Sequence, residues 1–562
     1  MSKPKTKIGS SFVRPWLIEA LAAGERPARV KGGVRLDAAE AASAPTVSGF
    51  DTGDLNRFPD AEPTALAARM AEVYGVAPEC LAVVEGVAAA SDLIVRLFRR
   101  PEGREAVIVA PGTISGGGFS SSAASAASSA LLHGARLVDL ATDMRAGFDI
   151  DALKAEISGA VGDAVVFLAS PTYATGEALD QTALLSLIDE APTALFVIDE
   201  SFVEFAGGES LASAAAEREN LIVLRSLSRA YGLAGAPCGA AIASAGLADI
   251  LRRAAALRPL PRATATLALA ALAPMQAPLI ERRIAQTAAE RGRIAEALAQ
   301  SPHVDKVLPG AANFVALEIK DADALARRLA ERGVRIDFDD SAAPVVARVT
   351  VGTPTENDLA LAAFGVEPKG RPARIAEIAR DTKETKIAAR VNLDGAPGAC
   401  VSTGIGYFDH MLEQIAKHGG FELTLTCKGD VHVDAHHTIE DCMLALGGLL
   451  KEALGEKKGI QRFGFTLPMD ETEAEALIDL SGRPYAVFEG EFAATHLGDY
   501  PTEMTAHAFR SLAETLGAAI HVKTKGENDH HKTEACFKAF GRALREAIRV
   551  EGEDLPSTKG VL

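Results

Sequence analysis

The sequence predicts two domains of different fold class, an α/β domain over residues 1–365 and an α+β domain over residues 374–562, joined by a linker at residues 366–373. Three observations support this prediction. A chain of 562 residues exceeds the size of one ordinary domain. Short apolar runs alternate with Ala/Leu/Arg-rich segments in the first part of the chain, and ten of the twelve histidines lie after residue 400. We therefore expect the two parts to perform different chemistry.

Fully apolar runs in the first part predict buried β-strands separated by helices. These runs are EAVIVAPG (105–112), DAVVFLASP (163–171), TALFVIDE (193–200) and NLIVLRSL (220–227). Strands of this kind are typical of a mostly parallel sheet that helices cover on both faces. We also expect a smaller α+β lobe over residues 309–353.

Two segments interrupt this pattern. FGVEPKGRPARI (364–375) is rich in Pro, Gly and basic residues and contains the predicted linker. SGGGFSSSAASAASSA (115–130) has low complexity and is compatible with either a flexible loop or a helix of small residues.

Composition excludes several classes of partner. The net charge of -17 argues against a nucleic-acid-binding surface, although a local basic pocket for a phosphate remains compatible with it. We find no apolar stretch long enough to span a membrane and nothing that resembles a signal peptide, so we expect no membrane partner. The six cysteines are scattered without a CxxC pair, which is typical of reduced thiols in a cytoplasmic protein.

The second part of the chain contains an internal repeat built around histidines. In each copy one histidine, His410 or His507, precedes the pattern HH-x-x-E on an amphipathic segment. The two copies of that pattern are AHHTIED (435–441) and DHHKTEA (529–535). Two repeated half-domains related by a pseudo-twofold axis are the simplest explanation.

The spacing within the repeat predicts metal ligands. On a helix, residues i and i+4 share a face, whereas residues i and i+1 point about 100° apart. The first histidine and the glutamate of each copy can therefore hold one ion, and the second histidine must point elsewhere, towards a second ion. The candidate ligands are His410, His436, His437, Glu440, His507, His530, His531 and Glu534.

Imidazole and carboxylate ligands suit Mn, Fe or Zn, and the spacing does not choose among them. Asp441 and Asp529 are candidate acceptors for imidazole N–H groups. One HH-x-x-E pattern is as compatible with surface histidines as with a metal site. Two copies, each preceded by a further histidine, favour the metal site.

Residues 374–562 resemble imidazoleglycerol-phosphate dehydratase over essentially the whole length of that family. The matching motifs are RDTKETKI (380–387), STGIGYFDHML (402–412), DAHHTIED (434–441), RFG (462–464), PMDE (468–471), DLSGRP (479–484), NDHHKTEA (528–535) and PSTKGVL (556–562). The resemblance implies a lyase of histidine biosynthesis, which removes water from imidazole glycerol phosphate and gives imidazole acetol phosphate.

The resemblance also implies the cofactors and the roles of individual residues. Two Mn²⁺ or similar divalent ions are expected per site, bridged by the substrate ring as an imidazolate, and the hydroxyl leaves through a diazafulvene-like intermediate. Glu384 is the implied acid/base, and Glu534, a presumed ligand, is a weaker candidate. The residues implied in phosphate binding are Arg462, Arg483, Ser557 and Lys559. Family members form cage-like 24-mers with metal sites at subunit interfaces, so we expect a homo-oligomer through both domains.

Residues from about 10 to 365 resemble histidinol-phosphate aminotransferase, a fold-type I enzyme that uses pyridoxal phosphate (PLP). The matching motifs are LNRFPD (55–60), FVIDESFVEFA (196–206), NLIVLRSLSRAYGLAG (220–235), ANFV (312–315) and ARVTVGTPTEND (347–358). The resemblance implies that Asp199 occupies the place of the aspartate that pairs with the pyridinium nitrogen. Arg348 occupies the place of the arginine that binds the substrate carboxylate.

Five positions of the implied cofactor pocket depart from the family pattern. Arg229 replaces the Schiff-base lysine, and a guanidinium stays protonated and cannot form the aldimine. Pro237 replaces a phosphate-binding arginine, and Tyr173 replaces an asparagine. Phe202 lacks a tyrosine hydroxyl, and Thr113 stands where an aromatic ring would stack on the cofactor. We therefore expect this domain not to bind PLP covalently and not to catalyse transamination.

Two alternatives remain open on the sequence. The chain could be a bifunctional enzyme that performs both the dehydration and the transamination that follows it. The N-terminal module could instead serve as a scaffold, or as a sensor of phosphates of the histidine pathway.

Overall fold

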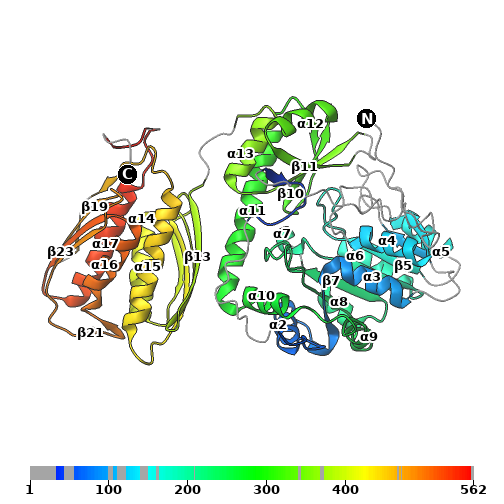
Figure 1. Cartoon of the computed structure of the whole chain (residues 1–562), viewed down its shortest axis with the longest axis horizontal. Coiled ribbons are helices and arrows are strands. Elements are labelled where there is room, and N and C mark those ends of the chain that lie inside the picture. Colours follow the sequence, from blue (N-terminus) through cyan, green and yellow to red (C-terminus); the bar gives the residue numbers. More distant parts are fainter. Residues whose placement is uncertain are drawn as a thin grey trace. The chain divides into compact units, whose positions relative to one another are not determined.

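A computed structural model describes residues 33–42, 56–98, 106–109, 122–139, 150–159, 164–207, 209–339, 344–367, 373–464, 467–469, 471–552 and 554–557. The described residues fall into two compact units (Figure 1). The first contains those before residue 273 and those from 283 to 367, and the second contains residues 273–282 and those from 373 onwards.

A seven-stranded sheet forms the centre of the first unit, in the order β2-β8-β7-β6-β5-β3-β4. Its strands are β2 (Leu81–Val84), β3 (Ala106–Val109), β4 (Arg136–Asp139), β5 (Ala164–Ala169), β6 (Ala194–Asp199), β7 (Leu221–Ser226) and β8 (Gly239–Ile242). β8 runs antiparallel to both of its neighbours, and the other pairings are parallel. The four strands predicted from apolar runs are β3, β5, β6 and β7, and the prediction of a mostly parallel sheet is confirmed.

Helices surround this sheet because both faces of its strands are apolar. They are α2 (Thr64–Tyr74), α3 (Gly86–Phe98), α4 (Ser122–His133), α5 (Ile150–Gly159), α6 (Gln181–Glu190), α7 (Val203–Ala206), α8 (Ala212–Glu217), α9 (Ala245–Ala255) and α10 (Arg262–Ala271), with a 3-10 turn at Pro78–Cys80. A 3-10 turn at Pro274–Gln276 and the start of α11 (Ala277–Leu298) belong to the residues grouped with the second unit, and the rest of α11 belongs to the first. The described end of the low-complexity segment is therefore a helix of small residues, α4.

A smaller lobe of the first unit contains a second sheet, in the order β1-β11-β12-β10-β9. Its elements are β1 (Val34–Leu36), β9 (Val304–Val307), β10 (Phe314–Ile319), α12 (Ala322–Glu331), β11 (Val334–Asp339), β12 (Val346–Thr350) and α13 (Pro354–Ala363). Thr353 and Glu356 form a reciprocal capping box at the start of α13, which fixes where the helix begins. The predicted α+β lobe at 309–353 thus also includes β1, β9 and α13.

The second unit contains two sheets, each with four consecutive hydrogen-bonded strands that have the same order of antiparallel and parallel pairings. The first sheet has the order β13-β14-β16-β15, and the second has the order β17-β19-β23-β20, with β18 paired to β19. In each sheet the last pairing is parallel and the others are antiparallel. The strands are β13 (Ile375–Asp381), β14 (Thr385–Asn392), β15 (Gly398–Ser402), β16 (Glu422–Gly429), β17 (Phe463–Gly464), β18 (Leu467–Met469), β19 (Thr472–Asp479), β20 (Tyr485–Glu489) and β23 (Ala519–Lys525), and a hairpin pairs β21 (His496–Leu497) with β22 (Tyr500–Pro501).

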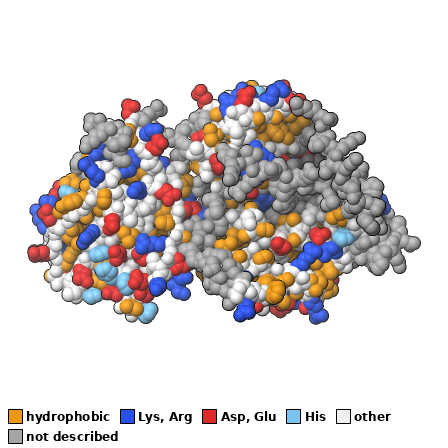
Figure 2. Space-filling model, viewed as in Figure 1, with side chains coloured by type: hydrophobic (Ala, Val, Ile, Leu, Met, Phe, Trp, Pro, Cys, Tyr) orange, Lys and Arg blue, Asp and Glu red, His pale blue; other side chains and the backbone are white. Residues whose placement is uncertain are grey.

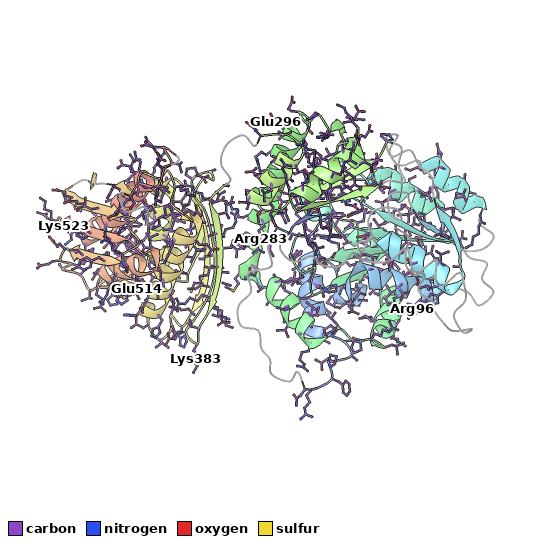
Figure 3. The ribbon with its side chains drawn as sticks, turned by 45° about the horizontal axis from the view of Figure 1, so that its top comes forward. Arg96, Arg283, Glu296, Lys383, Glu514 and Lys523 are labelled. Atoms are coloured by element: carbon purple, nitrogen blue, oxygen red, sulfur yellow. The ribbon has the colours of Figure 1, made fainter. Side chains whose placement is uncertain are left out.

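Four helices lie between these two sheets (Figure 1). They are α14 (Gly406–Gly419), α15 (Ala435–Leu454), α16 (Met504–Leu516) and α17 (Asp529–Ala547). One apolar core joins side chains from the helices and from the inner faces of both sheets, including Phe408, Leu446, Phe509 and Phe540. Polar side chains such as Lys523 project from the outer face of the second sheet (Figure 3). The histidines of the repeat therefore stand on helices that a continuous core holds in place.

No single helix within the described ranges is long and apolar enough to cross a membrane, and one bent pair of helices, Arg262–Ala271 with Pro274–Leu298, meets that test by length and composition alone.

Candidate functional site

Both HH-x-x-E patterns lie in the first turn of a helix, where a polar cap fixes the backbone. The side chain of Asp434 accepts a hydrogen bond from His436 N at 3.0 Å. Asn528 accepts from His530 N at 2.9 Å and from His531 N at 3.4 Å. Such caps satisfy N–H groups that the start of a helix leaves unpaired. They fix the positions of the histidine pairs at the starts of α15 and α17.

The first cluster, here called the Glu440 centre, consists of His436 and Glu440 from α15 and His507 from α16. His436 Nε2 lies 3.4 Å from Glu440 Oε2. The ring centroids of His436 and His507 are 4.7 Å apart. Within the described part of the chain, these three residues offer ligand atoms that all lie within 4.8 Å of one another. The three side chains can therefore bind a single ion.

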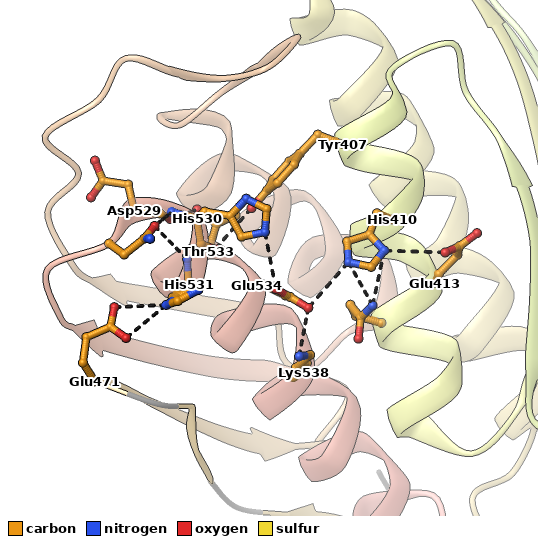
Figure 4. A network of polar contacts seen from close by, with 12 residues as sticks. Tyr407, His410, Glu413, Glu471, Asp529, His530, His531, Thr533, Glu534 and Lys538 are labelled. Atoms are coloured by element: carbon orange, nitrogen blue, oxygen red, sulfur yellow. Dashed lines mark hydrogen bonds and ion pairs between the residues drawn. The ribbon is translucent and has the colours of Figure 1, made fainter.

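The second cluster, the Glu534 centre, consists of His410 from α14 with His530 and Glu534 from α17 (Figure 4). Glu534 Oε1 lies 3.5 Å from His410 Nε2, and its Oε2 lies 3.5 Å from His530 Nε2. Lys538 Nζ lies 2.8 Å from Oε1 of the same carboxylate. Burial opposes ionisation of Glu534, but Lys538 and the two imidazoles outweigh it and lower the pKa of the carboxyl.

Each centre combines the two copies of the repeat. The HH-x-x-E helix of the first copy, α15, packs against α16, and that of the second copy, α17, packs against α14. Each pair of ligands from one copy therefore meets the isolated histidine of the other copy. The sequence spacing predicted that the first histidine and the glutamate of each pattern share an ion. It did not predict that the third ligand of each centre comes from the other copy. On the face shown in Figure 2, histidine and acidic side chains gather over the second unit.

The second histidine of each pair faces away from these centres. The ring planes of adjacent histidines differ by 75° in the first copy and by 82° in the second. His437 Nδ1 lies 3.1 Å from Asp430 Oδ2, and its Nε2 lies 3.9 Å from Glu384 Oε1. His531 Nδ1 lies 3.0 Å from Glu471 Oε2. The hydrogen bond with Asp430 raises the pKa of His437, and that with His531 lowers the pKa of Glu471.

The prediction that Asp441 or Asp529 accepts from an imidazole is wrong. Asp441 Oδ1 pairs with Arg380 Nη2 at 2.7 Å, and its Oδ2 accepts from Thr385 Oγ1 at 2.5 Å. Asp529 pairs with Lys532 Nζ at 2.5 Å and accepts from a backbone N–H at 2.6 Å. Both carboxylates therefore hold their own helices to neighbouring strands and loops. Asp430 and Glu471 do contact imidazoles; Asp430 lies between β16 and α15, Glu471 lies in the turn before β19, and neither has a helical spacing that would identify it.

Of the predicted phosphate-binding residues, Arg462 lies beside the segment that carries Ser557, whereas Arg483 lies elsewhere on the surface. Arg462 donates to both oxygens of Asp479, at 2.6 and 3.2 Å, and to the carbonyl that precedes Ser557, at 3.0 Å. The C-terminal PST segment therefore begins beside this guanidinium. Arg483 is exposed, two residues before β20. Lys559 lies outside the described residues.

In the first unit, Arg229 stands in the turn after β7 and is buried. Its Nη1 donates to the carbonyl of Ala38 and, at 2.8 Å, to that of Ala39. Asn313 Nδ2 donates to the same Ala39 carbonyl at 3.0 Å, and Ala39 N donates to Thr350 Oγ1 at 2.8 Å. The segment after β1 is thus held against the turn that carries Arg229. The sequence did not reveal this role, because these partners are far apart along the chain.

Three aromatic rings pack against one another beside Arg229. The centroids of Tyr173 and Phe202 are 6.0 Å apart, and Phe314 lies 5.6 Å from Tyr173 and 5.7 Å from Phe202. The guanidinium of Arg229 lies over the Phe202 ring at 5.3 Å, and that of Arg348 lies over the Tyr173 ring at 4.9 Å. All five side chains are buried, so this region is a packed cluster.

The other residues of the implied cofactor pocket have protein partners of their own. Arg348 Nε donates to Asp337 Oδ2 at 2.7 Å. Asp199 Oδ1 accepts from Ser201 N at 2.9 Å and from its Oγ at 2.5 Å. Pro237 is exposed next to the start of α3. The prediction for Thr113 falls outside the described residues.

Comparisons with known proteins divide the chain in the same way. The model of the aminotransferase class I and II family matches residues 32–364, and that of imidazoleglycerol-phosphate dehydratase matches residues 403–544. The histidine biosynthesis bifunctional protein HisB of Actinobacillus pleuropneumoniae is 59% identical over 192 residues, which are 34% of this chain and 53% of that protein. The protein of the same name from Stenotrophomonas maltophilia is 60% identical over 189 residues, again 34% of this chain and 53% of that protein. The chain therefore spans about half the length of the curated relatives it matches.

A solved structure shows the fold of the first unit. The histidinol-phosphate aminotransferase of Sinorhizobium meliloti, in complex with pyridoxal-5'-phosphate, matches with a TM-score of 0.52 and 24% identity. The match covers 64% of this chain and 97% of that protein. The chain belongs to the aminotransferase class I and II family through residues 32–364, and it carries an imidazoleglycerol-phosphate dehydratase domain at residues 403–544.

Proposed function

We propose that this protein is an imidazoleglycerol-phosphate dehydratase of histidine biosynthesis, which removes water from imidazole glycerol phosphate to give imidazole acetol phosphate. The observation that carries the proposal is the pair of clusters at Glu440 and Glu534, each with two imidazoles and one carboxylate. The identity of 59% to a histidine biosynthesis protein over this region supports it. We place the dehydratase domain at residues 374–562, the other domain at 1–365 and the linker at 366–373.

The donors in the two clusters fit divalent metal ions. Two imidazole nitrogens and one carboxylate oxygen suit Mn²⁺, Fe²⁺ or Zn²⁺, and three protein donors leave positions for substrate. We infer two such ions per site, with Mn²⁺ as the family resemblance implies. When bound, they supply Lewis acidity, which favours loss of a proton from the substrate ring at neutral pH.

Glu384 is the proposed acid/base of the reaction. Its side chain is 52% exposed, and its Oε1 lies 3.9 Å from His437 Nε2. It is therefore accessible to a substrate and close to a proposed metal ligand. Glu534 is the weaker candidate, because its oxygens already face His410, His530 and Lys538.

We propose that the substrate phosphate lies between Arg462 and the C-terminal segment that carries Ser557 and Lys559. Arg462 supports this because its guanidinium reaches the backbone just before Ser557. A guanidinium fork suits phosphate oxygens, and here two of its nitrogens also donate to Asp479, so a phosphate would share these donors with that carboxylate. Arg483, exposed on the surface, would contribute from a neighbouring subunit.

We propose a homo-oligomer, for which the 24-mer cage of the family is the expected form. His437 and His531 support this, because they face away from the centres of their own chain and their side chains are 34% and 31% exposed. A fourth ligand from a second chain would complete each centre. The identical strand order of the two sheets supports an origin by duplication of one half-domain.

We propose that the first unit has the aminotransferase fold but does not catalyse transamination. PLP requires a lysine for its aldimine and space for its ring, and the packed rings of Tyr173, Phe202 and Phe314 beside Arg229 offer neither. The unit would then serve as a scaffold or as a sensor of pathway phosphates. We propose that the whole protein acts in the cytoplasm, without a nucleic-acid or membrane partner.

The proposal is tested by metal analysis and a dehydration assay on the full chain. Chelation should remove both the bound metal and the activity, and Mn²⁺ should restore both. Glu440→Gln should retain the fold but lose activity, because one centre loses its charged ligand. Full turnover by the chelated protein, or by the Glu440→Gln variant without bound metal, would refute the proposed function.

A further inference from the structure

The two proposed metal centres have the same ligands but different neighbours. Lys538 follows Glu534 by one helical turn and places its Nζ 2.8 Å from Glu534 Oε1. Leu444 holds the equivalent position after Glu440, one turn along α15. The Glu534 centre therefore has an ammonium group at the position where the Glu440 centre has an apolar side chain.

Lys538 contacts the same carboxylate oxygen that faces the isolated histidine of the other copy. Glu534 Oε1 lies 3.5 Å from His410 Nε2 and 2.8 Å from Lys538 Nζ (Figure 4). The side chain of Glu534 is 11% exposed and that of Lys538 is 29% exposed, so solvent screens their charges only partly. A divalent ion at this centre has to share the oxygen with the ammonium and is repelled by its charge.

Charged side chains of both signs flank the Glu534 centre along α14 and α17. Burial lowers the pKa of His418, and the charges of Lys538, Arg542 and Lys417 lower it further, whereas the charge of Glu534 opposes them. Lys417 follows His410 by seven residues and Glu514 follows His507 at the same spacing, but three residues after each histidine the signs are reversed, with Glu413 in the first copy and Arg510 in the second. Glu413 Oε2 also lies 3.6 Å from His410 Nδ1, so the surrounding charges are mixed, and the difference between the centres rests on Lys538, which contacts the ligand oxygen itself.

We propose that the two metal positions differ in affinity: the Glu440 centre binds its ion first and more tightly, and Lys538 makes the Glu534 centre the weaker site. This inference rests on the proposed function, because it assumes that both centres bind metal. Lys538 is a positioning residue in this account, since it acts through Glu534.

The test is a Mn²⁺ titration of the metal-free full chain, with free Mn²⁺ measured by its electron paramagnetic resonance signal. We expect two binding steps of equal stoichiometry, separated in affinity by roughly tenfold or more. Glu440→Gln should remove the tight step and Glu534→Gln the weak one, which assigns the steps. Lys538→Met should tighten the weak step by about tenfold, and Leu444→Lys should weaken the tight step by a similar factor.

The Leu444→Lys variant is the matched control, because it adds the ammonium at the equivalent position instead of removing it, and circular dichroism checks the fold of both variants. Two equal steps in the wild type would overturn the inference but leave the dehydratase proposal standing. A weaker second step in Lys538→Met would also overturn it, because Lys538 would then support the ligand. Absence of any Mn²⁺ binding would refute the proposed function itself.

Discussion

Arg229, which stands where the family resemblance implies a catalytic lysine, makes hydrogen bonds that hold distant parts of the first unit together. Its planar guanidinium reaches the carbonyls of Ala38 and Ala39, which tie the segment after β1 to the large sheet. Burial lowers the pKa of Arg229, but Tyr173 and Asp199 oppose that shift, and a guanidinium starts from a pKa of about 12 or higher. Arg229 therefore stays protonated, and its hydrogen bonds hold the segment after β1 against the turn that follows β7.

Arg229→Lys should not restore a PLP enzyme. The variant regains the amine, but the rings of Tyr173, Phe202 and Phe314 still fill the space beside it. We expect no visible absorption band of an aldimine when PLP is added. We also expect a loss of about 1–3 kcal/mol in the free energy of unfolding, because the shorter lysine side chain does not place a donor where Arg229 Nη1 donates to two buried carbonyls. Denaturant titration measures that loss. A visible aldimine band that disappears on borohydride reduction and leaves PLP covalently attached would contradict the account.

Asp430→Asn should lower the pKa of His437. The hydrogen bond with Asp430 is the main reason that this pKa is raised, ahead of the charge of Glu384. His437 should then lose its proton at a lower pH, which NMR titration of the metal-free protein measures. Glu384→Gln is the matched control and should lower the pKa less. An unchanged His437 titration in Asp430→Asn would contradict the contact.

At the scale of elements, two adjacent glycines on α15 have opposite surroundings. A Cβ at Gly447 would lie 2.1 Å from Thr515 Oγ1 and 2.7 Å from the backbone oxygen of Leu512 on α16. A Cβ at Gly448 would meet nothing within 4 Å. Gly447 therefore sets the distance between α15 and α16, the helices that carry the Glu440 centre.

Gly447→Ala should lower the free energy of unfolding by about 1–3 kcal/mol, because the methyl group forces the helices apart. It should also weaken metal binding at the Glu440 centre, since His507 moves away with α16. Gly448→Ala, one residue along the same helix, should be neutral or stabilise by up to about 1 kcal/mol through helix propensity. Denaturant titration of both variants measures this contrast, and equal effects would contradict the packing described.

The sequence predicted elements better than it predicted their partners. Apolar runs identified the central strands of the first unit, because burial on both faces leaves a continuous signal. Helical spacing linked His436 to Glu440, since residues four apart share a face. It could not link either to His507, because that contact depends on how two helices from different repeats pack. For the same reason it missed Asp430 and the carbonyls that hold Arg229.

At the scale of the whole molecule, the proposed assembly depends on histidines that face away from their own centres. His437→Ala should weaken metal affinity by at least roughly 10- to 100-fold, the loss that follows removal of an outer-shell partner, and should therefore reduce the metal bound per chain. It should also reduce the size of the oligomer, because a bond between chains is lost. His432→Ala, an exposed histidine nearby, is the matched control and should change neither. Light scattering with metal analysis measures both quantities, and a monomer that retains two ions would contradict the proposal.

One measurement tests the central claim about both units together. The purified full chain, loaded with Mn²⁺, is incubated with imidazole glycerol phosphate in the presence of PLP and glutamate, and the products are followed by mass spectrometry. We predict that imidazole acetol phosphate accumulates and is not converted further, because the dehydratase centres act and the Arg229 pocket does not. The appearance of histidinol phosphate would contradict the inactivity of the first unit, and the absence of imidazole acetol phosphate would contradict the function proposed for the second.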